Sequence, residues 1–197
     1  MNTASMRTLL AISFPMIISQ GAFAIMIFTD RYFMSMISPT HLAASLGGGV
    51  ASYFCLSLFI GVLSYTTALV AQSFGAGKLG NCSRALTQSI IMALCSTPLL
   101  VLITVAVSYL FAAIGHDPRQ VELEEIYFKV LMLGALITLM KVCLGSYFSG
   151  IGRTRNVMIA DGLGVLLNIP LSYALVFGRF GLPEMGIVGA GIGTILG

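Results

Sequence analysis

Long uncharged stretches, separated by short polar segments, divide the 197-residue chain into units of membrane-spanning length. A helix needs roughly 20 apolar residues to cross about 30 Å of hydrocarbon. Windows of that length predict spans at about 8–37, 42–78, 85–115, 126–150 and 157–177, and a sixth that starts near Ile187. Because the chain stops at Gly197, the sixth span is cut short. The pattern predicts an all-α membrane protein, a bundle of six transmembrane helices with the last one truncated.

The segments between the spans refine this prediction. The run 42–78 is too long for one perpendicular crossing, which favours a tilted helix that extends beyond the membrane. Pro98 predicts a kink in the third span, and Lys141 interrupts the fourth. "HDPRQVELEE" (116–125) is the most polar segment and is typical of a capped, solvated helix start.

Composition agrees with a bilayer environment. The chain is 57% hydrophobic and 9% charged, with a mean hydropathy of +0.98, whereas soluble domains carry about 25% charged residues. The net charge of +3 is small and scattered, which excludes nucleic acid as a partner. The four cysteines form no CxxC pair, so we interpret them as reduced packing residues.

Lysine and arginine positions predict the orientation, because cytoplasmic loops carry an excess of them. With the N-terminus inside, five fall on the inner side and four on the outer side. The inner residues are Arg7, Lys78, Arg84, Arg153 and Arg155, and the outer ones are Arg31, Arg119, Lys129 and Arg179. We expect a multi-pass protein of the bacterial inner membrane with a cytoplasmic N-terminus.

Enzyme signatures are missing from the sequence. Its two histidines, His41 and His116, fall in the outer flanks, so neither a histidine-based triad nor an HExxH zinc helix can be built. "GAGK" (75–78) is no phosphate loop, because Gln72 stands where the first glycine is needed and Leu79 replaces the Ser or Thr. We therefore expect no enzymatic activity, no cofactor and no certain metal site.

Asp30 is the first ionisable residue after the uncharged stretch 8–29. It either marks the outer end of the first helix, paired with Arg31 at the headgroups, or it lies within the membrane, where carboxylates usually face a cavity, a partner or an ion path. The second interpretation is favoured because "RYFMSMI" continues the apolar pattern past it. Ser19 and Phe23 share its helix face, with Pro15 below them.

The fifth span shows a second polar face. Asp161, Asn168 and Ser172 follow a spacing of i, i+7, i+11, which places them on one stripe. Pro170 should loosen this helix and free a backbone carbonyl, which makes it a candidate hinge. Alternatives remain open: Asp161 could be solvated or form an ion pair with Lys141, and Asn168 could be a hydrogen-bond link between helices.

Several segments resemble the multidrug and toxic compound extrusion (MATE) family. They are "AQSFGAGK" (71–78), "YFSGIGRTRNVM" (147–158), "LLNIPLSYALVFGRFGLPEMGIVGAGIGTILG" (166–197) and the first helix with Pro15 and Asp30. The resemblance implies one lobe of a two-lobe transporter, with residues 1–197 as the N-terminal six-helix lobe. Such transporters expel small cationic amphipathic drugs in exchange for protons or sodium ions. The missing C-terminal half, or a second copy of the chain, would supply the other lobe.

The resemblance also implies a coupling site. It places the family's acidic residue on Asp30 and its other polar positions on Asn168, Ser172 and Thr194, with Asp30 and Asn168 as the residues that could hold a sodium ion if sodium is the coupling ion. Some relatives have an acid where this chain has Ser172, so proton and sodium coupling both stay open.

These residues suggest a mechanism. Loss of water favours the protonated form of a carboxyl group, and loading the site would favour a bend of the first helix near Pro15. Phe23 and Met26 are candidates for the drug cavity because they lie near the Asp30 face. Two other functions compete with drug efflux: a lipid-linked oligosaccharide flippase of the same superfamily, and a membrane assembly subunit that transports nothing.

Overall fold

The computed structural model describes residues 6–113 and 115–197, except for a few side chains near the N-terminus that include those of Arg7 and Thr8. The basic residue that begins the orientation argument, Arg7, therefore lies outside the described side chains. Within these ranges the chain forms eight helices and no strand. They are α1 (Met6–Ile37), α2 (Pro39–Ser64), α3 (Thr66–Gly75), α4 (Leu79–Ala113), α5 (Pro118–Leu133), α6 (Ala135–Gly150), α7 (Thr154–Phe177) and α8 (Gly186–Leu196).

Local sequence chemistry sets several helix ends. Ser38 begins α2 as its N-cap and accepts a hydrogen bond from the His41 amide at 3.2 Å, and Pro39 occupies the first helical position. Asp117 caps α5 in the same way, accepting from the Arg119 amide at 2.9 Å. Gly178 ends α7 in the left-handed conformation, with φ of 64°. At these three helix ends the capping residues satisfy backbone groups that the helices leave free.

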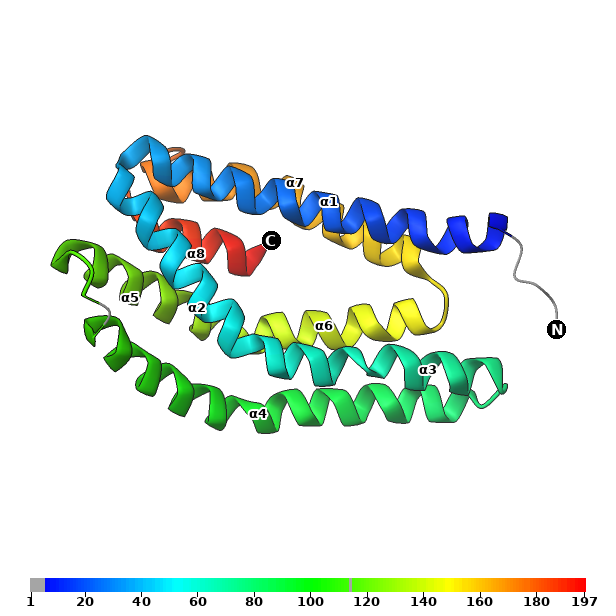
Figure 1. Cartoon of the computed structure of the whole chain (residues 1–197). Helices are drawn as coiled ribbons and strands as arrows, with labels where there is room; N and C mark the ends of the chain where they lie inside the picture. The colour runs from blue at the N-terminus through cyan, green and yellow to red at the C-terminus, as the bar shows by residue number, and fades with distance from the viewer. Residues whose placement is uncertain (1–5, 114) are drawn as a thin grey trace.

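The described helices confirm an all-α membrane protein. Four segments are long and apolar enough to span a membrane: Ser13–Ile37, Pro39–Gly75, Leu79–Ala113 and Thr154–Phe177. A fifth crossing arises if the bent pair α5 and α6 counts as one span, and α8 is a shorter apolar helix of 11 residues. Pro98 lies inside the continuous α4, which Figure 1 shows to be curved along its length.

Two helix breaks differ from the sequence prediction. The predicted tilted helix over 42–78 is interrupted at Tyr65, where α2 passes into α3. Lys141, the charged residue within the fourth predicted span, lies inside the continuous α6; the helix break is at Gly134, where α5 and α6 meet at 47°, and was not predicted. A Cβ at residue 134 would overlap the Ile195 side chain of α8, so packing against α8 requires glycine there. The helix that carries the fourth span also starts earlier than residue 126, at Pro118.

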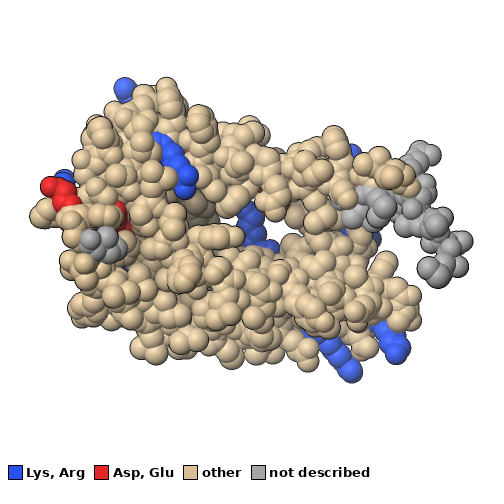
Figure 2. Space-filling model, viewed as in Figure 1, with Lys and Arg blue, Asp and Glu red and all other residues tan. Residues whose placement is uncertain are grey.

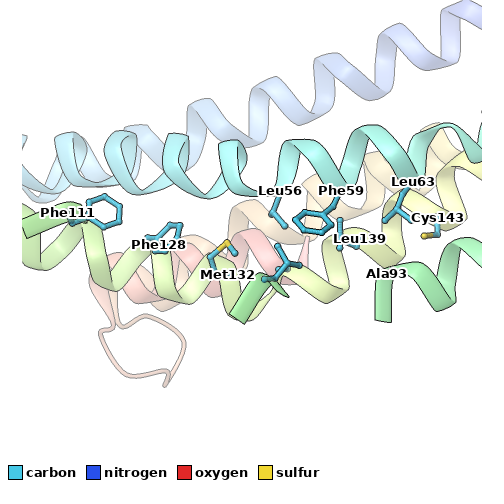
Figure 3. Packing of buried hydrophobic residues seen from close by; sticks show 11 residues of the cluster. Leu56, Phe59, Leu63, Ala93, Phe111, Phe128, Met132, Leu139 and Cys143 are labelled. Atoms are coloured by element: carbon cyan, nitrogen blue, oxygen red, sulfur yellow. The ribbon is translucent and has the colours of Figure 1, made fainter. Parts of the chain in front are cut away.

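The helices lie in two groups. In Figure 1, α1 and α7 run side by side and α8 lies next to α7, while α3, α4 and α6 form the other side and α2 and α5 cross between them. The larger apolar core lies where α2 meets α4, α5 and α6 (Figure 3). Phe128 and Leu139 are fully buried in it, and Phe111 contacts the Phe128 ring edge-on, with centroids 5.4 Å apart. Cys82 and Cys143 are buried, and all four cysteines are free, as predicted.

The contact between α2 and α5 depends on glycine. A Cβ at Gly48 would lie 2.7 Å from the Glu124 backbone oxygen, which cannot move aside as a side chain can. We expect Gly48→Ala to lower the free energy of unfolding by about 1–3 kcal/mol, although alanine raises helix propensity by up to about 1 kcal/mol. Thermal unfolding in detergent measures the change. Gly61→Ala, in the same helix with open space around it, is the control and should be neutral or stabilising; equal behaviour of the two variants would contradict the prediction.

Candidate functional site

Asp30 lies inside the helix bundle. Its side chain belongs to a residue only 5% exposed, and α1 continues seven residues beyond it to Ile37. Its Oδ2 accepts a hydrogen bond of 2.8 Å from the Thr194 hydroxyl of α8. No salt bridge joins Asp30 to Arg31 among the described residues. The carboxyl group therefore faces the interior of the helix bundle and links α1 to α8.

Asn168 and Ser172 of α7 complete the surroundings of the carboxyl group. Both residues are fully buried, with 0% exposure, and both side chains lie within interaction range of Asp30. Asp30 Oδ1, both amide atoms of Asn168 and the Ser172 hydroxyl have no hydrogen-bond partner among the residues that the structure describes. A buried polar atom without a partner costs about 1–3 kcal/mol. Several such atoms around one carboxyl group indicate a place built to receive a proton, a water molecule or a small cation.

Glycines in α8 allow these side chains to come together. A Cβ at Gly193 would overlap the Ser172 hydroxyl, and one at Gly197 would lie 2.5 Å from the Asn168 Cβ. Because Thr194 lies between these glycines, the helix face that packs on α7 also brings the threonine hydroxyl to Asp30. The glycines near the end of α8 thus allow α8 to pack closely on α7 at Ser172 and Asn168.

The Thr194 hydroxyl has a choice of two acceptors. Besides the Asp30 carboxyl, the Ala190 backbone carbonyl lies 2.9 Å from its oxygen. A hydroxyl has one hydrogen to donate and two lone pairs to accept with. It can donate to Asp30 when the carboxyl is ionised, or donate to Ala190 and accept from Asp30 when the carboxyl is protonated. The site can therefore satisfy either charge state without moving a helix.

Sequence reasoning missed buried aromatic residues that pack beside the site. Tyr127 of α5 is 7% exposed and lies beside Thr194 and Asp30. The apolar repeat of Leu123, Tyr127 and Leu131 along an otherwise polar helix start is the signal that could have revealed it. Phe33 packs on Tyr173 and Phe177 with ring centroids 5.7 and 6.0 Å away.

The remaining candidate residues are placed as follows. Met26 is 3% exposed and lies one helical turn before Asp30, whereas Phe23 is 44% exposed, so Met26 is the one that shares the buried face. Pro15 and Pro170 both lie inside continuous helices, α1 and α7. Ser19 has a buried hydroxyl for which the described part of the chain offers no hydrogen-bond partner, and it extends the polar face of α1.

Lys141 and Asp161 come together between α6 and α7, with Nζ and Oδ1 3.7 Å apart. Figure 2 shows a gap between the upper and lower parts of the molecule, with basic atoms visible in it. Lys141 is half-exposed and Asp161 is largely covered. The ion pair thus bridges the two groups, and Lys141 Nζ also donates to the Gly197 carbonyl at 3.4 Å.

Comparison with known proteins identifies relatives over nearly the whole chain. The MatE family model matches residues 15–174. Multidrug resistance protein PmpM of Pseudomonas aeruginosa is 34% identical, covering 97% of this chain and 40% of PmpM. Probable multidrug resistance protein NorM of Pseudomonas putida is 31% identical, covering 98% of this chain and 42% of the relative.

Solved structures agree. An outward-facing multidrug resistance MATE family transporter of the MOP superfamily superposes with a TM-score of 0.81 at 26% identity, covering 96% of this chain and 41% of that one. A MOP superfamily transporter from Pyrococcus furiosus gives the same TM-score, identity and coverage. The chain therefore spans about two fifths of the length of the relatives that it matches.

Proposed function

The chain belongs to the multidrug and toxic compound extrusion (MATE) family, and from this premise we propose that it is the N-terminal lobe of a multidrug antiporter. In the complete protein this lobe exchanges protons or sodium ions for cationic amphipathic compounds. The observation that carries the proposal is the buried group of Asp30, Thr194, Asn168 and Ser172, in which one carboxyl group is surrounded by polar atoms without partners.

The chemistry of this group suits a coupling ion. The lobe holds one carboxylate there, and the Thr194 hydroxyl accommodates both of its charge states. Oxygen atoms of carboxylates, amides and hydroxyls are the ligands that hard cations prefer. Asp30, Asn168, Ser172 and Thr194 together offer such oxygens, so a sodium ion is an alternative to the proton. In either case loading removes the net charge of a buried carboxylate.

Loading changes how the helices interact. An ionised Asp30 accepts a charge-assisted hydrogen bond from Thr194, whereas a protonated carboxyl donates to the same hydroxyl in a neutral bond, so loading weakens the link between α1 and α8 without removing it. The ion thus binds the two arrangements of α1 with different affinity, which is what coupling requires. Pro15, which removes one backbone hydrogen bond of α1, is the proposed hinge for the movement.

A drug pathway fits the apolar side of the lobe. Met26 lies next to the coupling site, and the chain carries eleven methionines and twelve phenylalanines. Flexible, polarisable side chains suit a surface that binds many ligands. A flippase for a lipid-linked oligosaccharide would need uncompensated positive charge for the phosphates, whereas Lys141 is balanced by Asp161. Drug efflux is therefore favoured over lipid transport.

Efflux by the complete protein tests this proposal. Expressed in bacteria that lack their own efflux pumps, it should lower the accumulation of ethidium, a cationic dye, compared with an empty vector. A proton uncoupler should abolish the difference if protons drive export, and a sodium ionophore should do so if sodium does. Dye accumulation equal to the empty-vector level would reject drug efflux, and efflux insensitive to both reagents would reject ion coupling.

A further inference from the structure

Glu124, on α5, is a second buried carboxylate that the proposed transport site does not use. It is 1% exposed. The neighbouring acids on the same helix have permanent cations as partners: Glu122 pairs with Arg119 at 2.9 Å and Glu125 with Lys129 at 2.6 Å. Among the described residues, no lysine or arginine pairs with Glu124.

The side chains that contact Glu124 carry no permanent positive charge. Gln120 Nε2 donates to its Oε1 at 2.8 Å, and His116 Nδ1 lies 3.1 and 3.2 Å from its two oxygens. The histidine carries a positive charge only when it is protonated. Its side chain is 43% exposed, so it is the outward-facing member of the pair. A buried carboxylate without a permanent counter-charge is costly, and this one is suited to receive a cation.

The position of Glu124 is fixed by the glycines of α2. A Cβ at Gly47 would lie 2.6 Å from the Glu124 Oε1, and one at Gly48 would contact the backbone of the same residue. The carboxylate therefore lies directly against the α2 backbone. This close approach holds the charge at a defined place instead of allowing it to reach water as a flexible surface glutamate would.

An open groove of about 510 Å³ leads to this carboxylate. Its walls are almost entirely apolar and come from α2 and the end of α4, with Leu46, Val50 and Phe54 on one side and Phe111 on the other. His116 and Glu124 form its polar end. Val50 and Phe54 are 63% and 78% exposed, so the groove opens outward from the lobe. Figure 2 shows acidic atoms at the end of the molecule where α5 begins.

We propose that this groove, hereafter the Glu124 groove, binds an amphipathic organic monocation. The apolar body lies along α2 over Val50 and Phe54, and the cationic group contacts the Glu124 carboxylate. His116, the exposed partner, is displaced by the incoming cation and returns when the site empties. The groove shares no residue with the Asp30 group, and the proposal does not depend on transport by the complete protein.

A tryptophan reporter tests the proposal directly, because the chain contains no tryptophan. Phe54→Trp places one on the groove wall, and Tyr109→Trp, at a residue of α4 that is 77% exposed and outside the groove lining, reports contact with the micelle. The probe is N-dodecylpyridinium, whose ring quenches tryptophan on contact, added to the full chain in dodecyl maltoside. We expect half-quenching of Phe54→Trp at a concentration about tenfold below that of Tyr109→Trp, which corresponds to about 1.4 kcal/mol.

Charge variants in the Phe54→Trp background decide the role of the carboxylate. Glu124→Gln should raise the half-quenching concentration about fivefold, whereas Glu122→Gln, which removes the same charge from an exposed ion pair two residues earlier, should leave it unchanged. The neutral quencher dodecyl nicotinate should not distinguish these variants. Equal quenching of the two tryptophan positions by the cation would reject the groove, and an effect of Glu124→Gln on both quenchers alike would reject the ionic contact.

His116→Ala provides a test that keeps Glu124 in place, and it decides the matter if Glu124→Gln does not fold. Removing the competing side chain should lower the half-quenching concentration about two- to threefold. An unchanged or higher concentration would contradict displacement of the histidine by the cation.

Discussion

Replacing Asp30 by asparagine should abolish ion-driven efflux by the complete transporter while leaving its fold and its drug binding in place. Asparagine has almost the same shape as aspartate, and its carbonyl oxygen can still accept the 2.8 Å hydrogen bond from Thr194. Its amide can donate toward Asn168 or Ser172, whose polar atoms lack partners. Asparagine cannot take up or release a proton, and it has no charge with which to attract sodium. The site is then fixed in the neutral form.

The measurement separates coupling from folding. In proteoliposomes containing the complete protein, an imposed ion gradient should drive ethidium export for the unaltered protein and not for Asp30→Asn. Thermal stability should change by less than about 1.5 kcal/mol, because one hydrogen bond at most is altered. Glu122→Gln, which neutralises an exposed carboxylate in an ion pair, should export at the normal rate. Gradient-driven export by Asp30→Asn equal to that of the unaltered protein would remove Asp30 from the coupling mechanism.

Much of the fold follows from the apolar runs, because the bilayer imposes strong rules on length and charge. The spans around α1, α4 and α7 match the prediction within a few residues at most ends. The breaks at Tyr65 and Gly134 do not follow from local sequence. Tyr65 is not a helix-breaking residue. Gly61 lies in open space inside the continuous α2, whereas Gly134, where the helix breaks, lies against Ile195 of α8. Such breaks are decided by contacts between distant segments.

The candidate site was only partly accessible from local patterns. The charge-free stretch before Asp30 and the polar stripe with Asn168 and Ser172 on α7 drew attention to each helix separately. That Thr194 belongs to the same group as Asp30 came from the family resemblance, and the structure adds the hydrogen bond between them, across 164 residues of sequence. Nothing in one sequence shows which helix faces meet, so Tyr127 was overlooked.

Glu124 illustrates the opposite error. Its segment is the most polar in the chain and predicts a solvated helix start, yet the residue is buried. The three consecutive glycines at 47–49 were the available signal, because a glycine face on an apolar helix allows another backbone to approach closely. Whether a polar residue at the end of a membrane helix is exposed or buried therefore depends on whether the neighbouring helix has small residues that allow close approach.

Gly193→Ala should separate α8 from α7 and impair both stability and transport, which would show that close helix contact assembles the coupling site. The new Cβ would overlap the Ser172 hydroxyl, so α8 must move outward or Ser172 must change its rotamer. An outward shift carries the adjacent Thr194 away from Asp30 and breaks the bond between α1 and α8. Overpacking of this kind costs about 1–3 kcal/mol. Because alanine favours helix formation over glycine by up to about 1 kcal/mol, a net loss of stability can only come from packing.

Leu196→Ala is the matched control for this test, since it alters the same turn of α8 at a side chain that is 61% exposed. It should leave gradient-driven ethidium export near normal, whereas Gly193→Ala should reduce export strongly and lower the unfolding temperature of the complete protein. If Gly193→Ala instead transports normally with unchanged stability, α8 does not need its close contact with Ser172, and the Thr194 hydroxyl cannot be what couples ion binding to helix movement. Loss of export together with full stability would place the effect in the geometry of the site, because Thr194 would then be displaced within an intact bundle.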